Sequence, residues 1–310
     1  MIINKPKFWD KKIGLISIFL FPLSLIFIFL IFVKKKITKK RSFKIPIICV
    51  GNIYVGGTGK TPTSIFLAKE IEKFGKKVAI LRKYYKEHID EHELIKKNFQ
   101  NLILNEDRLE GLSDVEKSNF DIVILDDGFQ DYRIKKNLNI ICFNRNQLIG
   151  NGLVMPSGPL RENLSALKDA DIVIINGDEE SSFKEKILDI NKKLKIFYSR
   201  YRPINIDRFR GKKLFAIAAI GNPDNFFQLL VQNNLNVEKK LSFPDHYKFS
   251  KNEIQKLVEE AKRTNYEIIM TEKDYLRVKD FKIENLNYLK VMLEINKQDE
   301  LLATIKELYD

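Results

Sequence analysis

Two hydrophobic patterns follow one another along this chain. Residues 13–33 form one uncharged apolar run of 21 residues, which as a helix rising about 1.5 Å per residue spans roughly 30 Å of hydrocarbon. Beyond residue 44 the apolar runs are short and alternate with amphipathic segments, and strands are expected at 47–50, 77–81, 121–125, 139–143, 171–175 and 195–198. Strands separated by helical patterns predict an α/β fold with a parallel sheet and helices on both faces.

The alternation of strand and helix patterns starts again near residue 213 and predicts a second, smaller α/β lobe. This lobe is expected to contain a strand from 213, a helix at 225–232, and strands at 267–270 and 288–293, and to end in a helix. The stretch 199–211, with Pro203 and several Arg, is the expected linker. The predicted domains are therefore an N-terminal anchor at 1–44, a core at 45–200 and the smaller lobe at 201–310.

The formal charge of +13 is concentrated at the N-terminus. Residues 1–44 contain eleven Lys and Arg residues and one acid, which gives +10, so the other 266 residues carry only +3. That distribution gives little support to a nucleic-acid footprint, and we expect no nucleic-acid partner. Cys49 and Cys142 lie in apolar stretches and are expected to be buried thiols. Three scattered histidines predict no metal cluster, so any metal is expected to have oxygen ligands, as Mg²⁺ does.

The apolar run is longer than the core of a signal peptide, and a Lys-rich stretch follows where a cleavage site would be expected, so a membrane anchor is favoured over a signal peptide. Pro22 would kink a helix, which leaves open whether the anchor spans the membrane or lies in its interface. The excess of lysines after the run places the body on the cytoplasmic side of the membrane. Membrane lipids are therefore expected partners, with the lysines near anionic head groups.

A glycine-rich segment after the first strand has the pattern of a phosphate-binding loop. The loop residues are expected to bind the nucleotide, with Lys60 reaching its β and γ phosphates and Thr61 binding Mg²⁺. The strict pattern has Gly at position 54, where this chain has Tyr54, and the alternative is a glycine-rich turn without a ligand. The candidate nucleotide-binding residues are Gly51, Asn52, Gly56, Gly57, Thr58, Gly59, Lys60 and Thr61.

An apolar strand at 121–125 ends in two acids, Asp126 and Asp127. Carboxylates at the C-terminal end of a parallel strand, next to the strand that carries the loop, are placed to hold Mg²⁺ or its water shell. Together with Thr61 they form the predicted metal site, and a solvated strand end is the alternative. The region 45–200 is thus predicted to be a P-loop kinase core that binds a nucleoside triphosphate and transfers its terminal phosphoryl group.

These features together resemble the tetraacyldisaccharide 4′-kinase family, the lipid A 4′-kinases of Gram-negative bacteria. The resemblance covers essentially the whole chain and also accommodates Tyr54, because the family clusters its glycines later in the loop. It is carried, in order, by the anchor, Val50-Gly51-Asn52 with Gly56 to Pro62, Asp126-Asp127-Gly128-Phe129-Gln130, Gly150-Asn151-Gly152 with Pro156 to Glu162, and Asp245-His246 followed by Thr271-Glu272-Lys273-Asp274.

The resemblance implies transfer of a phosphoryl group from ATP to the 4′-hydroxyl of the tetraacyldisaccharide 1-phosphate precursor of lipid A, at the inner face of the cytoplasmic membrane. It also implies an Asp-Glu pair that supplies the base, and Asp90-Glu91 is the nearest match. The surrounding sequence departs from the family: Arg82-Lys83-Tyr84-Tyr85 replaces Arg-Gly-Tyr-Gly, and His92 replaces Pro. These departures leave open the placement of the base and the level of activity.

Catalytic roles are accordingly expected for Asp90, His246, Lys60 and Asp127, with His246 orienting Asp90 or tuning it. A surface acid and a surface histidine are the alternatives for Asp90 and His246. Arg161 and Lys273 are candidates for holding a phosphate, or are charged residues of solvated loops. Two other functions remain open for the whole chain: a membrane-tethered ATPase switch, and a nucleotide-binding homologue with weakened catalysis.

Overall fold

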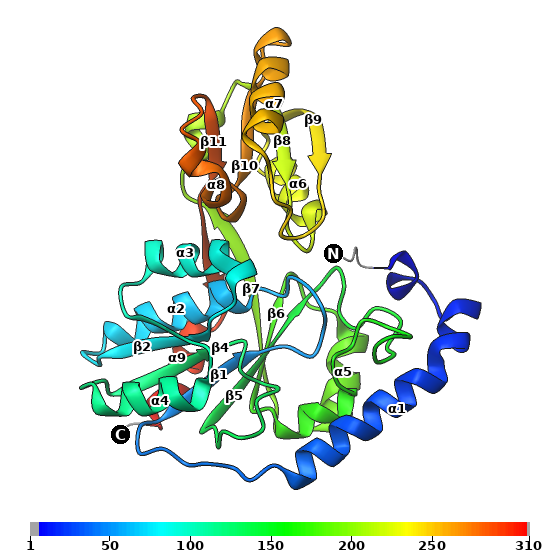
Figure 1. The fold of residues 1–310 in the computed structure, drawn as a ribbon, viewed down its shortest axis with the longest axis vertical. Coiled ribbons are helices and arrows are strands. Elements are labelled where there is room, and N and C mark those ends of the chain that lie inside the picture. The colour runs from blue at the N-terminus through cyan, green and yellow to red at the C-terminus, as the bar shows by residue number, and fades with distance from the viewer. Residues whose placement is uncertain (1–5, 309–310) are drawn as a thin grey trace. The chain divides into compact units, whose positions relative to one another are not determined.

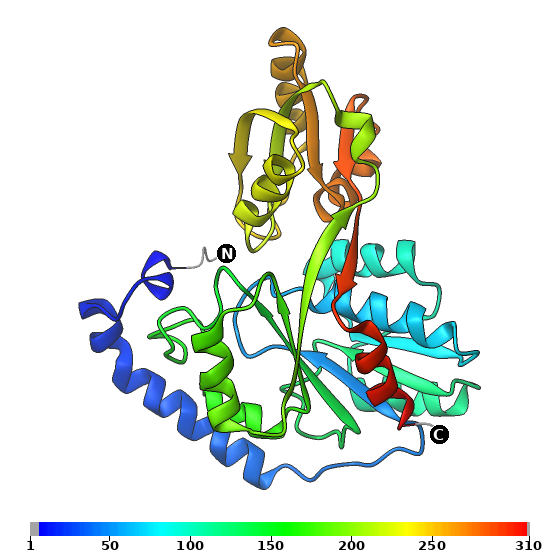
Figure 2. The ribbon, with the colours of Figure 1, turned by 180° about the vertical axis from the view of Figure 1, so that it is seen from behind.

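The computed structural model describes residues 6–308, which divide into two compact units. The larger unit contains 6–84, 99–200 and 295–308, and the smaller unit contains 85–98 and 201–294. Figures 1 and 2 show the ribbon from two opposite sides. The chain passes between the units after Tyr84, after Asn98, after Arg200 and after Glu294.

An eight-stranded sheet forms the centre of the larger unit, in the order β12-β7-β6-β5-β1-β4-β2-β3, and its strands β7 and β12 extend into the residue ranges of the smaller unit. All recorded pairings among β1 to β7 are parallel, which confirms the predicted P-loop-type parallel sheet. The strands are β1 (Ile47–Gly51), β2 (Val78–Lys83), β3 (Leu102–Asn105), β4 (Ile122–Asp126), β5 (Leu138–Asn144), β6 (Ile172–Asn176), β7 (Lys195–Pro203) and β12 (Val291–Ile295).

Helices cover both faces of this sheet because its strands are apolar on both sides. On one face, Ile47 and Cys49 of β1 join a core that includes residues of α4 (Arg108–Lys117) and α5 (Ser181–Ile190). The described helices of this unit also include α2 (Lys60–Glu72), which buries Leu67 and Ile71, and α9 (Gln298–Lys306). Short 3₁₀ turns occur at Lys7–Asp10 and Leu164–Asp169.

The smaller unit is a four-stranded parallel sheet in the order β11-β10-β8-β9. Alternate residues of β8 point to opposite faces: Leu214 packs with α6 (Pro223–Gln232), and Phe215 packs with α7 (Lys251–Arg263). The predicted second, smaller α/β lobe is therefore present. Its remaining elements are β8 (Lys213–Ala218), β9 (Asn236–Ser242), β10 (Glu267–Thr271), β11 (Leu286–Leu289), α3 (Ile89–Asn98), α8 (Glu272–Val278) and 3₁₀ turns at Lys86–His88, Ile206–Phe209 and Lys279–Phe281.

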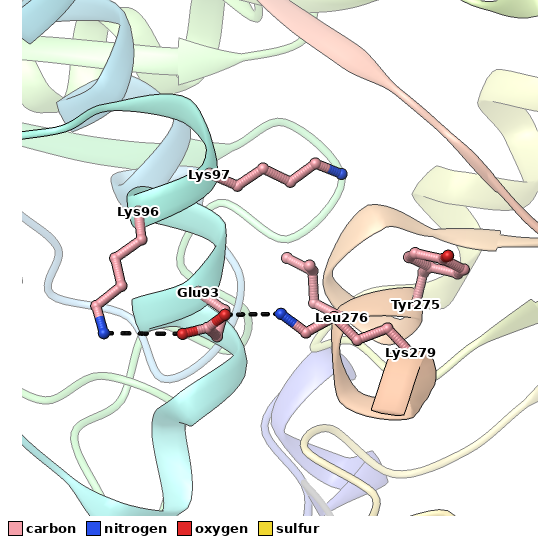
Figure 3. Close-up of a pocket in the computed structure, with 6 residues that line it drawn as sticks. All are labelled: Glu93, Lys96, Lys97, Tyr275, Leu276 and Lys279. Carbon is pink, nitrogen blue, oxygen red and sulfur yellow. Dashed lines mark hydrogen bonds and ion pairs between the residues drawn. The ribbon is translucent and has the colours of Figure 1, made fainter. Parts of the chain in front are cut away.

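The observed units differ from the predicted boundaries because α3 packs on α8 of the smaller unit. Figure 3 shows this contact, where Lys279 of the segment after α8 donates to Glu93 of α3 at 2.8 Å. Lys97 of α3 pairs with Glu272 of α8, also at 2.8 Å. The terminal helix α9 belongs to the larger unit. The strand expected at 288–293 is two strands, β11 and β12, which belong to different sheets.

The apolar N-terminal segment forms α1 (Leu15–Ile37), and within the described residues it is the one helix long and apolar enough to cross a membrane. It lies along one side of the larger unit (Figures 1 and 2). Ser17 and Ser24, seven residues apart and so on one helix face, are almost completely buried. Ser24 Oγ donates to the carbonyl of Val154 at 2.8 Å, and the Ser157 N–H donates to Ser24 Oγ at 3.0 Å.

The opposite side of α1 is a continuous apolar surface, which matches an anchor that touches lipid. Eleven large apolar side chains of the helix other than its last residue are at least 40% exposed, far more than a soluble helix leaves to water. They are Leu15, Ile16, Ile18, Phe19, Phe21, Leu23, Leu25, Ile26, Phe29, Leu30 and Phe32.

Candidate functional site

The phosphate-binding loop connects β1 to α2, and its backbone conformation requires glycine. Gly56 and Gly59 have φ of 131° and 91°, in the region that side chains rarely adopt. A Cβ atom on Gly51 would lie 2.4 Å from Cβ of Phe129, so the strand end admits glycine alone. Because α2 begins at Lys60, its first backbone N–H groups and its positive dipole end face the loop, where a phosphate is stabilised.

Tyr54 interrupts the general loop pattern and has a structural role here. Its ring is completely buried, in a cluster with Val154 and Leu160. The Tyr54 hydroxyl donates to Asp10 at 2.9 Å, and burial together with Asp10 raises the pKa of this phenol. Tyr54 therefore joins the loop to the segment before α1 and to residues 154–160.

Asp126, at the end of β4, is tied to the start of α2. Thr61 Oγ1 donates to Asp126 Oδ2 at 3.0 Å, and Ser64 Oγ donates to Asp126 Oδ1, also at 3.0 Å. The guanidinium of Arg82, from β2, forms a buried ion pair with the same carboxylate. A hydroxyl oxygen beside a carboxylate is a donor set that suits Mg²⁺, so the predicted pair of Thr61 and Asp126 fits a magnesium site.

Asp127 carries the second carboxylate, in a left-handed conformation with φ of 58°. Lys60 Nζ lies 3.6 Å from its Oδ1, and Arg161 Nη1 lies 3.2 Å from the same atom. Burial alone would raise the pKa of Asp127, but Lys60 and Arg161, with Arg82 and Arg108, lower it below its ordinary value. The carboxylate is therefore ionised at neutral pH and holds both Lys60 and Arg161 beside the loop.

Asn52 holds the loop closed from the inside. Its Nδ2 donates to the carbonyl of Tyr54 at 2.6 Å and to Thr58 Oγ1 at 3.0 Å. Gln130 Nε2 in turn donates to the carbonyl of Asn52 at 2.8 Å and to Glu162 Oε1 at 3.1 Å. Asn52, Gln130 and Glu162 thus form one hydrogen-bonded network, in which Asn52 shapes the loop through its side chain.

The other predicted catalytic residues meet in the smaller unit. Asp90, in the first turn of α3, is buried, and its Oδ2 lies 3.3 Å from His246 Nδ1. Arg277 of α8 donates to Asp90 Oδ2 from Nε at 2.9 Å and from Nη2 at 2.6 Å. Lys273 Nζ lies 3.5 Å away. Burial would raise the pKa of Asp90, but His246, Lys273 and Arg277 outweigh it and lower the pKa below its usual range.

Lys273 contacts three acids and His246, which makes it part of the same cluster. Its Nζ donates to Glu91 Oε1 at 2.9 Å and lies 3.3 Å from His246 Nε2 and 3.7 Å from Asp245 Oδ1. Lys273 is thus paired with carboxylates, and Arg161 likewise pairs with Asp127. Both basic side chains lie beside the predicted catalytic acids, and neither is a plain solvated charge.

Sequence reasoning missed the roles of Arg82 and Arg277. In the sequence Arg82 stands out only as part of a departure from a motif, although a basic residue at the end of β2 lies next to the end of β4 in the parallel register. Arg277 follows Lys273 by four residues on α8, so both occupy one helix face, and that spacing was the available signal.

The two cysteines have no part in either cluster. Both are buried free thiols, as expected, and burial raises the pKa of Cys49 to about 11 and that of Cys142 to about 12. Neither thiol ionises near neutral pH, so neither is a nucleophile or a metal ligand there.

Comparison with known proteins shows which family has this arrangement. The model of the family described as tetraacyldisaccharide-1-P 4′-kinase matches residues 16–310. The chain belongs to this kinase family. Membership confirms the resemblance found in the sequence and the predicted enzyme class, an ATP-dependent kinase of the lipid A precursor with an alcohol group as acceptor.

Curated relatives match along almost the whole chain. A tetraacyldisaccharide 4′-kinase from Pelagibacter ubique (strain HTCC1062) is 40% identical over 305 residues, covering 97% of this chain and 96% of the relative. One from Rickettsia akari (strain Hartford) is 32% identical and covers 96% of this chain and 94% of its own. Among solved structures, the apo form of LpxK from Aquifex aeolicus in complex with ATP has a TM-score of 0.72 at 23% identity, covering 96% of this chain and 100% of that one. It supports the same fold.

Proposed function

We propose that this 4′-kinase transfers the γ-phosphoryl group of ATP to the 4′-hydroxyl of a tetraacyldisaccharide 1-phosphate, with Mg²⁺, at the cytoplasmic face of the inner membrane. The observation that carries the proposal is the contact of Thr61 Oγ1 with Asp126 Oδ2 at 3.0 Å, at the start of the helix that follows the loop. It joins the two halves of a nucleotide and metal site that lie 65 residues apart in sequence.

In the larger unit, the chain's own groups bind and orient the nucleotide. The amides of Gly56, Gly57, Thr58 and Gly59 and the start of α2 bind phosphate oxygens, and Lys60 neutralises charge on the transferring group. Thr61 and Asp126 would hold Mg²⁺, with Asp127 close by, and Mg²⁺ when bound would neutralise phosphate charge during transfer. Arg82, already paired with Asp126, would neutralise the negative charge of that carboxylate when Mg²⁺ is absent.

In the smaller unit, Asp90 would accept the proton of the sugar hydroxyl. Its recorded contacts with His246, Lys273 and Arg277 all fall on Oδ2. Within the described part of the chain no contact is recorded for Oδ1, and we therefore assign Oδ1 the role of proton acceptor. His246 and Arg277 would then act as positioning residues, because they fix the carboxylate by its other oxygen.

The contacts of α1 support a helix that lies in the interface and does not cross the membrane alone. Before its first turn, Trp9 Nε1 donates to the carbonyl of Pro156 at 3.0 Å, and Asp10 accepts from Tyr54 of the loop. At its other end, Lys35 pairs with Glu162 at 3.0 Å. Both ends therefore contact the same water-facing unit that must take up ATP, which favours one side of the membrane for both.

The deciding experiment incubates the purified full-length protein in detergent with γ-labelled ATP, Mg²⁺ and the tetraacyldisaccharide 1-phosphate. Labelled lipid is the expected product. Loss of ATP without labelled lipid would indicate the ATPase switch, and nucleotide binding without turnover would indicate the weakened homologue.

Lys60→Ala is expected to lower kcat/KM by at least about a thousandfold. The substitution removes the ammonium group beside Asp127 that neutralises charge on the transferring phosphoryl group. Lys69→Ala, an exposed position on the same helix, serves as the matched control and should leave the rate unchanged. A fully active Lys60→Ala protein would disprove the assignment of the loop.

A further inference from the structure

Three potential metal ligands converge in the smaller unit outside the phosphate-binding loop. His88, Glu91 and His246 each offer one ligand atom within 4.8 Å of the other two. His88 Nδ1 lies 3.3 Å from Glu91 Oε2, and His246 Nε2 lies 3.8 Å from Glu91 Oε1. A tetrahedral ion with bonds of about 2.1 Å sets its ligands about 3.4 Å apart. Small rotations of these side chains would therefore bring all three onto one ion.

Access and ligand number also fit such an ion. The side chains of His88, Glu91 and His246 are 37%, 18% and 24% exposed, so an ion from solvent reaches them and water can complete its coordination. The two imidazole rings lie 4.5 Å apart between centroids. Two histidines and one carboxylate form a donor set of the kind that binds Zn²⁺ with one open position.

The charged neighbours of His246 favour the tautomer that a metal needs. Lys273 Nζ can only donate, and it lies 3.3 Å from His246 Nε2, so Nε2 is the atom that accepts. The proton of the neutral ring is then on Nδ1, which faces Asp90 Oδ2 at 3.3 Å. A carboxylate behind one ring nitrogen orients a histidine whose other nitrogen binds a metal.

The charge of the cluster favours a divalent cation. With neutral histidines, four carboxylates face two basic side chains, a net charge of −2. A cation that displaces Lys273 from His246 leaves this lysine with its acidic partners, so the displaced ammonium stays paired. The six charged groups are Asp90, Glu91, Asp245, Asp274, Lys273 and Arg277.

We propose that His88, Glu91 and His246 form a binding site for a borderline transition-metal ion of the Zn²⁺ class, and that occupancy inhibits the kinase. Imidazole ligands select such ions over Mg²⁺, which prefers oxygen alone. Inhibition follows because an ion on Nε2 of His246 places positive charge behind the ring whose Nδ1 faces Asp90, which makes that carboxylate a poorer proton acceptor. The inhibition rests on the proposed function, whereas binding of the ion does not.

The binding test uses the full-length chain in detergent, freed of metal and nucleotide, and titrated with Zn²⁺ by calorimetry and with Co²⁺ by visible absorption. Binding of one ion per chain is expected, with a tetrahedral Co²⁺ spectrum. His88→Gln should weaken Zn²⁺ binding at least tenfold, and Glu87→Gln, its exposed neighbour outside the cluster, should not. Circular dichroism verifies that each variant is folded, and His88→Ala serves if His88→Gln is not. Equal affinity of wild type and a folded His88 variant would overturn the site.

The kinase assay tests inhibition separately, at fixed excess MgATP. His88 packs on the ring of His246 and has no recorded contact with Asp90, so each variant's rate without Zn²⁺ serves as its own reference, and His88→Gln should require at least tenfold more Zn²⁺ for half inhibition. Identical inhibition curves, with binding lost in the variant, would overturn the regulatory half alone. An inactive wild-type chain that still binds Zn²⁺ through His88 would overturn the proposed function and leave the site standing.

Discussion

Asp90 lies among several basic side chains, and these partners set the pH range in which it can work. Arg277 approaches Asp90 Oδ2 through two nitrogens, and His246 and Lys273 approach the same oxygen. The lowered pKa of Asp90 keeps it ionised throughout the neutral range, at the cost of basicity. Asp90 is thus always ready to accept a proton, but as a weak base that relies on exact placement.

Replacing Arg277 should shift the acidic limb of the activity profile. In Arg277→Gln the pKa of Asp90 is expected to rise toward its ordinary value, because a cation in direct contact is lost. The acidic limb of kcat/KM against pH should therefore move to higher pH, whereas Arg277→Lys should retain most of the wild-type profile. An acidic limb that stays in place in Arg277→Gln would assign the base role to another group, with Asp126 and Asp127 as the next candidates.

The same substitution has a stability consequence with a definite sign. The folded-state pKa of Asp90 is lowered, so its ion pairs stabilise the fold above the unfolded pKa, near 3.9, and this contribution disappears as pH falls through the folded pKa. Urea unfolding of the wild type and of Arg277→Gln should therefore differ at pH 7, and the difference should begin to shrink below about pH 4 and keep shrinking as pH falls toward the folded pKa. A constant difference across that range would mean that Arg277 stabilises the fold by contacts other than its pair with Asp90.

At the scale of elements, polar contacts hold α1 against the larger unit, and the apolar sequence pattern of the helix does not predict them. Ser17 and Ser24 are the buried residues of this helix, and each is hydrogen-bonded to residues 151–157. The hydrophobic run predicted an anchor and did not show which face packs on protein. That face is marked only by two serines seven residues apart.

The proposed interfacial position of α1 predicts which side of the membrane each end reaches. Lys11→Cys and Lys36→Cys put exposed thiols at the two ends of the helix, whereas the native Cys49 and Cys142 are buried. In intact spheroplasts, a membrane-impermeant maleimide should label neither variant, and both should react after lysis. Labelling of Lys11→Cys from outside would establish a spanning helix.

The sequence predicted the elements with strong patterns and missed those without one. The strand expected at 47–50 is β1, and the loop that follows it was identified from local glycines. β3 was not predicted, because Leu102–Asn105 is a short edge strand that is only partly buried. The pair of Arg277 and Asp90 could not be predicted from local pattern, since the two residues are 187 positions apart.

At the scale of the whole molecule, the uneven distribution of charge predicts how the protein meets a membrane. Residues 1–44 carry +10 of the net +13, and many of these charges follow α1. Each lysine near an anionic surface contributes about 1 kcal/mol. Four substitutions in exposed positions, Lys34→Gln, Lys36→Gln, Lys39→Gln and Lys40→Gln, should together weaken binding to phosphatidylglycerol vesicles by up to about a thousandfold.

The control for this prediction keeps the change in net charge and moves it away from the anchor. Lys240, Lys251, Lys256 and Lys262 are exposed on the smaller unit, and their replacement by Gln also removes four charges. Vesicle sedimentation should show near wild-type binding for this control, and the affinity of the wild type should fall as salt rises, because screening shortens the reach of surface charge. Equal loss in both sets would mean that total charge governs the association, and unchanged binding in both would leave the apolar face of α1 as its sole source.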